Sequence, residues 1–312
     1  MTITQLKYVL AVAEHQNFTK AAQKTFVTQP TLSMQIQKLE EELDILIFDR
    51  SKKPIELTTV GKKIVSQAKN IVNESERMQD VVDQEKGFIG GEFKLGMIPT
   101  VMPTLLPMFL KTFTKRYPKV HLKIEELTTD EIIHKLQDGH LDAAIAATPL
   151  NHDKLKERVL YYEPFVGYIP ESHRLHSKGK INSSDLDLND ILLLEDGHCF
   201  RDGVINLCKA SKLQTGDTFQ LESGSFETLI KLSNEGLGMT LLPYLHTLDV
   251  SAAQKNHLHY FNEPSPAREV SIIYSKSELK LQIITALYDV IAAVIRGAIA
   301  FQDVKIISPI KS

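Results

Sequence analysis

The stretch that most constrains the fold begins at Val60, after which apolar and small residues recur at alternating steps of four and three positions. The recurring residues are Ile64, Ala68, Ile71, Ser75, Met78 and Val82. This spacing is typical of a helix that packs against a second helix along one seam. No other obvious core covers that seam, so a second copy of the chain is the expected partner. Gly87, Gly90 and Gly91 then break the helix and predict a hinge.

The residues before this helix predict shorter helices with recognisable starts. Thr2 and Gln5 have the spacing of a capping box ahead of the first helix. Thr19 is a plausible cap for the second helix, and Thr28 can cap a third in which Pro30 is tolerated in the first turn. Short helices joined by a tight turn are the ingredients of a helix-turn-helix, although any small helical domain with a solvated polar face would also fit.

The third helix carries the side chains suited to DNA. Leu32, Ile36 and Leu39 share its apolar face, and the remaining surface carries hydroxyls and amides that can hydrogen-bond base edges and phosphates. The basic turn at 50–54 and the alternating residues at 55–58 predict a wing whose cations contact phosphates. The expected DNA-binding residues are Gln29, Pro30, Thr31, Ser33, Met34, Gln35, Lys38, Arg50, Lys52 and Lys53.

Overall charge does not reveal a nucleic-acid binder, because the chain has a formal net charge of -3. Any basic surface must therefore be local. The start of the chain shows no secretory signal, and the apolar stretch Leu281–Ala300 is interrupted by Asp289 and Arg296. We expect that stretch to be a buried helix, and the protein to be cytoplasmic with no membrane partner.

The second part of the chain alternates between strand and helix patterns. The predicted strands are Phe93–Ile98, Val120–Ile124, Leu141–Ala147, Ile191–Leu194, Met239–Pro243 and Val270–Tyr274. The predicted helices are Leu105–Tyr117, Glu131–Gln137, Phe226–Asn234 and a final helix after Ser277. Alternation of this kind predicts an α/β domain with a mostly parallel sheet covered by helices.

The chain has 2 cysteines, Cys199 and Cys208. His198 and Arg201 flank the first, and such cations can lower a thiol pKa from roughly 8.5 to about neutrality. A thiolate attacks peroxide to give a sulfenic acid, with which a second thiol can condense. Residues 203–207 read as a short helix; if it persists, the thiols lie farther apart than a disulfide tolerates and local unfolding is required. Two unrelated structural cysteines remain the simpler alternative, and a zinc site lacks an evident fourth ligand.

Five segments in the first sixty-odd residues resemble the LysR-type transcriptional regulators. They are Phe18–Ala22, Thr28–Ser33, Leu39–Leu43, Leu46–Arg50 and Leu57–Gly61. The resemblance implies a winged helix-turn-helix, a dimerising linker helix and a two-lobed α/β effector domain of periplasmic-binding-protein type. It also implies self-association as a dimer or tetramer, and binding to double-stranded promoter DNA.

The cysteine region is similar to that of the peroxide-sensing members of this family. The matching segments are Leu194–Asp202 with Cys208, Gly96–Val101, Leu105–Pro107, Phe226–Leu229 and Gly238–Pro243. The resemblance implies that Cys199 is the peroxidatic thiol and Cys208 the resolving thiol. It places Thr100, Thr129, His198 and Arg201 around the peroxide. Phe200 and Gly203 depart from the usual residues, and 214–224 matches poorly.

These patterns predict a regulator, with no enzymatic turnover, no cofactor and no bound metal. The resemblance implies hydrogen peroxide as its signal and RNA polymerase as its partner, with activation of oxidative-stress genes as the outcome. The expected domains are a winged helix-turn-helix at 1–60, a linker helix at 61–86 and a hinge at 87–92. Regulatory subdomain I would comprise 93–165 and 269–300, subdomain II with the redox loop 166–268, and the tail 301–312. The alternatives are a regulator of a small metabolite bound between the lobes, with incidental cysteines, and a thiol peroxidase or ligand-binding protein.

Overall fold

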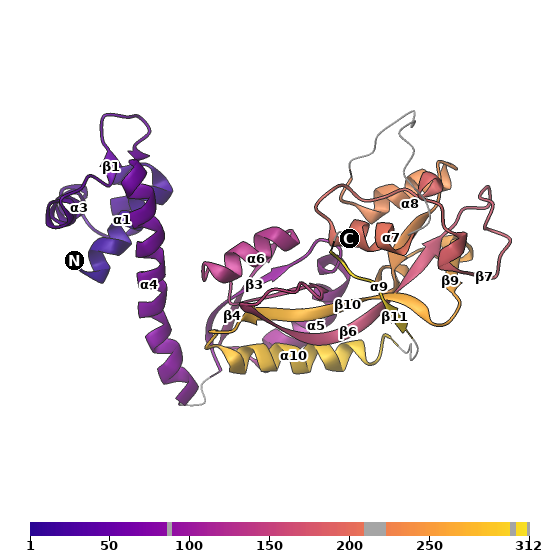
Figure 1. Ribbon diagram of the computed structural model, residues 1–312. Coiled ribbons are helices and arrows are strands. Elements are labelled where there is room, and N and C mark those ends of the chain that lie inside the picture. The colour runs from indigo at the N-terminus through magenta and orange to yellow at the C-terminus, as the bar shows by residue number, and fades with distance from the viewer. Residues whose placement is uncertain (86–88, 209–222, 300–303, 311–312) are drawn as a thin grey trace. The chain divides into compact units, whose positions relative to one another are not determined.

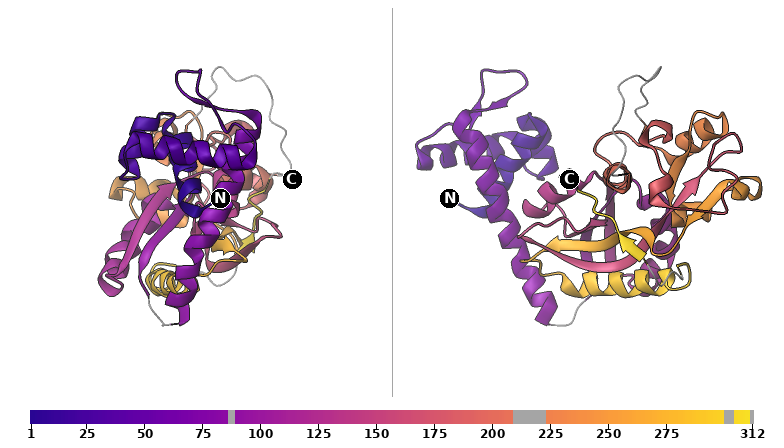
Figure 2. Two further views of the ribbon diagram at one scale, coloured as in Figure 1. Left: turned by 90° about the vertical axis from the view of Figure 1, so that its left-hand side faces the viewer. Right: turned by 45° about the vertical axis from the view of Figure 1, so that its right-hand side comes forward.

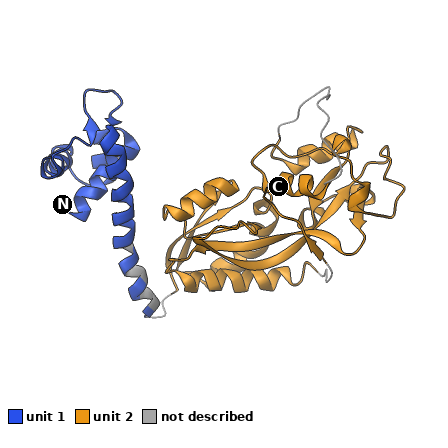
Figure 3. Cartoon of the chain, in the orientation of Figure 1, with its two compact units in different colours: residues 1–88 blue, residues 89–312 orange. Residues whose placement is uncertain are grey.

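The computed structural model describes residues 1–85, 89–208, 223–299 and 304–310. The chain divides into two compact units, Met1–Phe88 and Ile89–Ser312 (Figures 1 and 3). The predicted hinge begins at Gly87, and most of the poorly matching stretch 214–224 precedes residue 223; both lie in part outside the described residues. Each unit has hydrophobic clusters of its own.

The first unit contains the predicted short helices, α1 (Ile3–His15), α2 (Phe18–Lys24) and α3 (Gln29–Leu43). The capping box of Thr2 and Gln5 is confirmed, as is the Thr28 cap of α3. The Thr19 cap is wrong, because the N-cap of α2 is Asn17, two residues earlier, whose Oδ1 accepts a hydrogen bond from the Lys20 amide at 2.9 Å. Asn17 keeps an extended backbone, which an N-cap requires, whereas Thr19 is already helical.

A two-stranded wing and a long helix complete this unit. The wing pairs β1 (Phe48–Asp49) with β2 (Glu56–Leu57) in antiparallel register. Helix α4 runs over Thr59–Glu85. In its first half, Val65, Ala68 and Val72 are buried in the core that α1 also lines. The expectation that α4 has no core of its own to cover is therefore wrong for this half.

From Ile71 onward, α4 also carries apolar residues on its surface. Met78 is 71% exposed, and Ile71 and Val82 are also exposed. These three residues belong to the predicted helix seam, and the α4 core residues Val65 and Val72 lie off it. Among the described residues, this part of the seam therefore presents exposed apolar side chains that a partner helix can cover.

The second unit is built on a mixed sheet in the order β4-β3-β5-β10-β6-β9-β7, with β11 beside β10 and β8 beside β6. Its strands are β3 (Gly91–Met97), β4 (Val120–Glu126), β5 (Ala143–Thr148), β6 (Leu155–Tyr168), β7 (Lys180–Ile181), β8 (Thr240–Pro243), β9 (Leu258–Phe261), β10 (Ser265–Ser275) and β11 (Val304–Ile306). β3 runs parallel to β4 and β5, whereas β10 runs antiparallel to β5 and β6. The long strands β6 and β10 are shared by both lobes.

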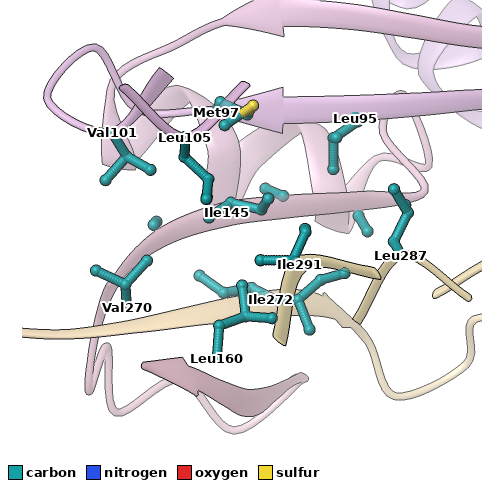
Figure 4. Close-up of a cluster of buried hydrophobic side chains, with 14 of the residues drawn as sticks. Leu95, Met97, Val101, Leu105, Ile145, Leu160, Val270, Ile272, Leu287 and Ile291 are labelled. Carbon is teal, nitrogen blue, oxygen red and sulfur yellow. The ribbon is translucent and has the colours of Figure 1, made fainter. Parts of the chain in front are cut away.

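Helices cover this sheet and divide its core into two clusters. α5 (Met102–Arg116) packs against α10 (Leu281–Ile295), which lies along one face of the sheet in Figures 1 and 2, and α6 (Thr129–Gln137) covers the other face. The first cluster lies between these helices and the strands (Figure 4). The second contains the buried apolar residues of α7 (Cys199–Leu207) other than Cys199, those of α8 (Phe226–Asn234), and Leu242 just before α9 (Tyr244–Thr247). Short 3-10 turns occupy Ser183–Asp185, Leu188–Asp190 and Ala252–His257.

Two sequence expectations have clear outcomes here. Ile191–Leu194 is not a strand, because only Ile191 forms a bridge, to Met239. Its apolar residues are buried in the second cluster without a continuous ladder. α10 has 15 residues and is mostly buried on its inner face. Among the described residues, no helix combines the length and apolar character needed to cross a membrane.

Candidate DNA-binding face and redox centre

Most of the predicted DNA-binding side chains lie on the surface of α3 and the wing. The exposed ones are Gln29, Pro30, Thr31, Met34, Lys38, Arg50, Lys52 and Lys53. Ser33 and Gln35 are half-buried and already make internal contacts: Ser33 Oγ accepts from Arg50 Nη1 at 3.4 Å, and Gln35 Oε1 accepts from Gln5 Nε2 at 3.4 Å. The structure therefore brings α3 and the wing cations together through Ser33 and Arg50.

Glu40 is the residue that fixes Arg50, and sequence reasoning missed it. Its carboxylate is 4% exposed, and Oε1 accepts from the backbone amides of Ile47 and Phe48. Oε2 accepts from Arg50 Nη2 at 2.8 Å, while the guanidinium lies 5.2 Å from the Phe18 ring centroid. One carboxylate thus joins α3 to the first wing strand and orients a wing cation toward solvent.

The Cys199 thiol is buried at the first residue of α7. Burial raises its pKa, and Asp202 acts in the same direction. Three groups oppose this by stabilising the thiolate: the Arg268 guanidinium, the Thr129 hydroxyl and the backbone amide of Ala147. The partial positive charge at a helix N-terminus also favours the thiolate. The resting group is therefore a protonated thiol whose ionised form has prepared partners.

Arg268 is the cation of this site. Its Nε and Nη2 donate to Glu163 Oε2 at 2.9 and 2.7 Å, and the pair is nearly inaccessible to solvent. Nη1 and Nη2 donate to the Thr100 hydroxyl and carbonyl, both at 2.9 Å. Leu245 N donates to Glu163 Oε1 at 2.9 Å. These hydrogen bonds fix the guanidinium between Glu163 and Thr100, where its charge favours the Cys199 thiolate.

The Thr129 hydroxyl is buried and, among the residues that the structure describes, makes no hydrogen bond of good geometry to oxygen or nitrogen; it is close enough to Cys199 to lower the thiol pKa. Its neighbour Thr128 is the N-cap of α6 and forms a capping box with Glu131. The Thr128 hydroxyl is thus engaged within its own helix, and Thr129 is the threonine that acts on the sulfur.

His198 and Arg201 lie beside Cys199 in sequence, but the largest influences on the thiol pKa come from burial and from other residues, Arg268 first among the groups that lower it. His198 Nε2 lies 3.4 Å from Glu195 Oε1. Arg201 donates to the Leu194 carbonyl at 2.9 Å and pairs with Asp196 at 3.0 Å. Both side chains thus stabilise the loop that precedes α7.

Cys208 lies at the opposite end of α7, as its C-cap. A helix rises about 1.5 Å per residue, so the two cysteine Cα atoms are roughly 13 Å apart, well beyond the ~7 Å limit for a disulfide. Neither of these two cysteines is part of a disulfide, and both are buried. Burial, followed by Asp190 and Asp187, raises the pKa of Cys208 to about 12. At this separation the two thiols cannot share a metal ion.

The two residues that depart from the usual pattern pack α7 onto the second lobe. The Phe200 ring lies 5.0 Å from both Phe165 and Phe226, and 5.2 Å from the Arg268 guanidinium. A Cβ at Gly203 would come within 3.3 Å of the Phe165 ring. Helix α7 is continuous through Gly203, so this glycine serves a close approach to the aromatic ring.

Two protein-family models cover most of the chain. "Bacterial regulatory helix-turn-helix protein, lysR family" matches residues 3–62, and "LysR substrate binding domain" matches residues 86–296. The chain belongs to the LysR family. This confirms the winged helix-turn-helix, linker helix and two-lobed effector domain of periplasmic-binding-protein type. It is a DNA-binding regulator of a family whose members self-associate.

Individual relatives of this LysR-type regulator are peroxide-response proteins by name. The hydrogen peroxide-inducible genes activator of Pectobacterium carotovorum subsp. carotovorum is 32% identical, with 88% of this chain and 90% of that protein covered. The DNA-binding transcriptional dual regulator OxyR of Escherichia coli (strain K12) is 31% identical, covering 88% and 89%.

Solved structures agree with these relatives. Full-length OxyR C199D from Pseudomonas aeruginosa has a TM-score of 0.74 at 34% identity, covering 93% of this chain and 94% of that one. An H2O2-bound OxyR mutant from Corynebacterium glutamicum has a TM-score of 0.63 at 26% identity, covering 98% of each. The resemblance to the peroxide-sensing members of the family is confirmed, and OxyR is the name those members carry.

Proposed function

We propose that this protein is a transcriptional regulator that hydrogen peroxide switches through oxidation of Cys199 and a disulfide between Cys199 and Cys208. The observation that carries the proposal is the placement of the buried Cys199 thiol against Arg268, Thr129 and the Ala147 amide. These groups lower the cost of forming a thiolate in a site closed to water. The relatives named above respond to hydrogen peroxide according to their names, which supports the same signal here.

The chemistry takes place in two balanced steps. The sulfur of Cys199 attacks one oxygen of hydrogen peroxide, an S–O bond forms, the O–O bond breaks, and the second oxygen leaves as water with the thiol proton. The Cys208 thiol then displaces the hydroxyl of the Cys199 sulfenic acid, giving a disulfide and a second water. Because α7 separates the thiols by roughly 13 Å, the second step requires this helix to unwind. A segment with two alternative arrangements is what a switch requires.

The DNA-binding unit converts this change into regulation. The outer half of α4 would pair two copies through Ile71, Met78 and Val82, so that two α3 helices contact promoter half-sites. The oxidised form would then act with RNA polymerase, as an activator in the cytoplasm. Oxidation is stoichiometric in this scheme, and the protein is a regulator rather than a peroxidase.

Mass spectrometry of the reduced protein after a brief, near-stoichiometric peroxide pulse tests the proposal. An intramolecular Cys199–Cys208 disulfide is expected, and the Cys208→Ser variant should instead accumulate a Cys199 sulfenic acid. Thiols that stay reduced while a known reactive thiol is oxidised would refute the peroxide signal. In that case the family membership would stand, and a metabolite-responsive regulator would replace the proposal. Continuous peroxide consumption with a reductant, in the absence of DNA, would instead indicate a peroxidase.

A further inference from the structure

The Tyr161 hydroxyl is a buried donor that the proposed function has not used. The side chain is 6% exposed, and its hydroxyl has no hydrogen-bond partner within the part of the chain that the structure describes. Buried hydroxyls almost always find a partner, because an unmet donor loses its hydration without compensation. A phenylalanine would fill the same space without that cost, so the hydroxyl calls for an explanation.

Strand register places Tyr161 on the same face of the sheet as the charged pair. In the antiparallel ladder of β6 and β10, Tyr161 lies opposite Val270 and Glu163 lies opposite Arg268. Residues two apart along a strand share a face, so Tyr161 and Glu163 are neighbours on one side. Figure 4 shows Val270 and Val101 at the same end of the first core cluster. Val101 directly follows Thr100 in the sequence. Tyr161 and Cys199 are members of this cluster too.

Electrostatics link the phenol to the thiol through one cation. Arg268 interacts with the charges of Glu163, Tyr161 and Cys199. Burial and the Glu163 carboxylate raise the pKa of Tyr161 well above its ordinary value. At physiological pH the phenol therefore stays protonated. It can act as a neutral hydrogen-bond donor but not as an anion.

A second buried hydroxyl, that of Thr129, also belongs to this site. It acts on the Cys199 sulfur and favours the thiolate, and it has no other hydrogen-bond partner among the described residues. Two buried hydroxyl donors, one thiol and one guanidinium would suit a small ligand with two oxygen atoms. A hydroperoxide has that composition, and each of its oxygens can accept a hydrogen bond.

Building on the proposed function, we propose that the Tyr161 hydroxyl binds the leaving oxygen of the hydroperoxide that oxidises Cys199. The sulfur attacks the oxygen nearer to Thr129, forming the S–O bond while the O–O bond breaks. The sulfur loses two electrons to the peroxide, and the leaving oxygen takes the thiol proton and departs as water. Tyr161 keeps its own proton and stabilises the charge that builds up on the leaving oxygen.

The test is the rate of Cys199 oxidation in the full-length Cys208→Ser protein, with and without Tyr161→Phe. We expect the substitution to slow oxidation by hydrogen peroxide at least about 10-fold, since a single donor to a developing oxyanion contributes that much or more. Alkylation of Cys199 by iodoacetamide should be unchanged, because this reaction has no leaving oxygen to stabilise. The Tyr161→Phe protein should also unfold at the same or a higher temperature. Tyr162→Phe is the matched control, because Tyr162 is the next residue, 43% exposed and on the opposite face.

Three outcomes would overturn the inference. The peroxide rate could stay within 2-fold of the parent, it could fall in parallel with alkylation, or Tyr162→Phe could slow it equally. Each would show that the hydroxyl does not contact the leaving oxygen, while the proposed function would stand. A parent protein that is alkylated at Cys199 but not oxidised by peroxide would instead refute the proposed function, and this inference with it.

Discussion

Replacing Arg268 by methionine separates the two tasks of this residue, which balances Glu163 and favours the Cys199 thiolate. Methionine keeps most of the side-chain length but removes the charge and the hydrogen bonds to Glu163 and Thr100. Glu163 is 1% exposed, so its carboxylate would remain buried without a countercharge. Breaking a buried ion pair in this way costs about 3–5 kcal/mol of unfolding free energy.

The same substitution should suppress the thiolate. Arg268 is the strongest of the groups that lower the Cys199 pKa. An opposite charge at close range shifts a pKa by about 1–3 units, so its removal should reduce the thiolate fraction near neutral pH by roughly 10- to 1000-fold. Ultraviolet absorbance of the thiolate against pH, in the Cys208→Ser background, measures this directly. Iodoacetamide alkylation of Cys199 gives a second readout.

A double variant, Glu163→Gln with Arg268→Met, controls for instability. Removing both partners of a buried pair is often close to neutral. The double variant should therefore be more stable than Arg268→Met by roughly 2 kcal/mol or more. The Cys199 pKa should stay high because the cation is still absent. If the double variant is stable and its thiolate titrates as in the parent, Arg268 does not tune the thiol and the electrostatic account of this site is refuted.

Three further expectations concern the other elements. Burial raises the pKa of Cys208 to about 12, so the folded state favours the protonated thiol. This stabilisation is complete below the unfolded pKa of about 8.5 and is lost as pH rises toward 12, at up to ~1.4 kcal/mol per pH unit. Urea unfolding at several pH values should show this slope in the parent protein and lose it in Cys208→Ala. Asn206 Nδ2 donates to the Ser308 and Ile310 carbonyls at 3.0 and 2.8 Å. Asn206→Ala should therefore lower the unfolding free energy by about 1–3 kcal/mol, speed disulfide formation and raise amide exchange in α7. An unchanged rate of disulfide formation would contradict this. Met78→Glu should weaken dimers in sedimentation equilibrium, and dimers of unaltered affinity would exclude the outer α4 seam as an interface.

Sequence patterns succeeded where the determining interactions are local. The helix predicted at Phe226–Asn234 has those bounds in the structure, and Leu32 and its partners on α3 are buried as expected. Capping explains both the success and the failure at the helix starts. Thr28 is flanked by no competing cap, whereas Asn17 and Thr19 both offer an acceptor and only the backbone shape decides between them. The apolar run at 191–194 is buried without forming a strand ladder, so its hydrophobicity alone does not predict a strand.

The redox site shows the limit of the same reasoning. Sequence neighbours suggested His198 and Arg201 as the cations near Cys199, yet Arg268 on β10 is the cation that acts on the thiol. That contact depends on the pairing of β6 with β10, which sets Glu163 opposite Arg268. Glu163 and Arg268 are charged residues within otherwise buried strands, and this is the sequence signal that could have indicated a buried ion pair. Their register across two distant strands could not be read from local spacing.

The packing of α7 sets the threshold of the proposed switch. Its first turn is held by Phe200 between two aromatic rings, and its last turn by Asn206 and the buried Cys208. A disulfide requires both ends to approach by about half their separation, so these contacts must be lost before the bond can form. The contacts therefore stabilise the reduced state, and weaker packing lowers the barrier without touching the peroxide chemistry. Substitutions at Phe200 or Asn206 should consequently alter the rate of disulfide formation, whereas substitutions at Arg268 or Tyr161 should alter the rate of sulfenic acid formation. Measuring the two steps separately would distinguish a residue that shapes the switch from one that contacts the signal.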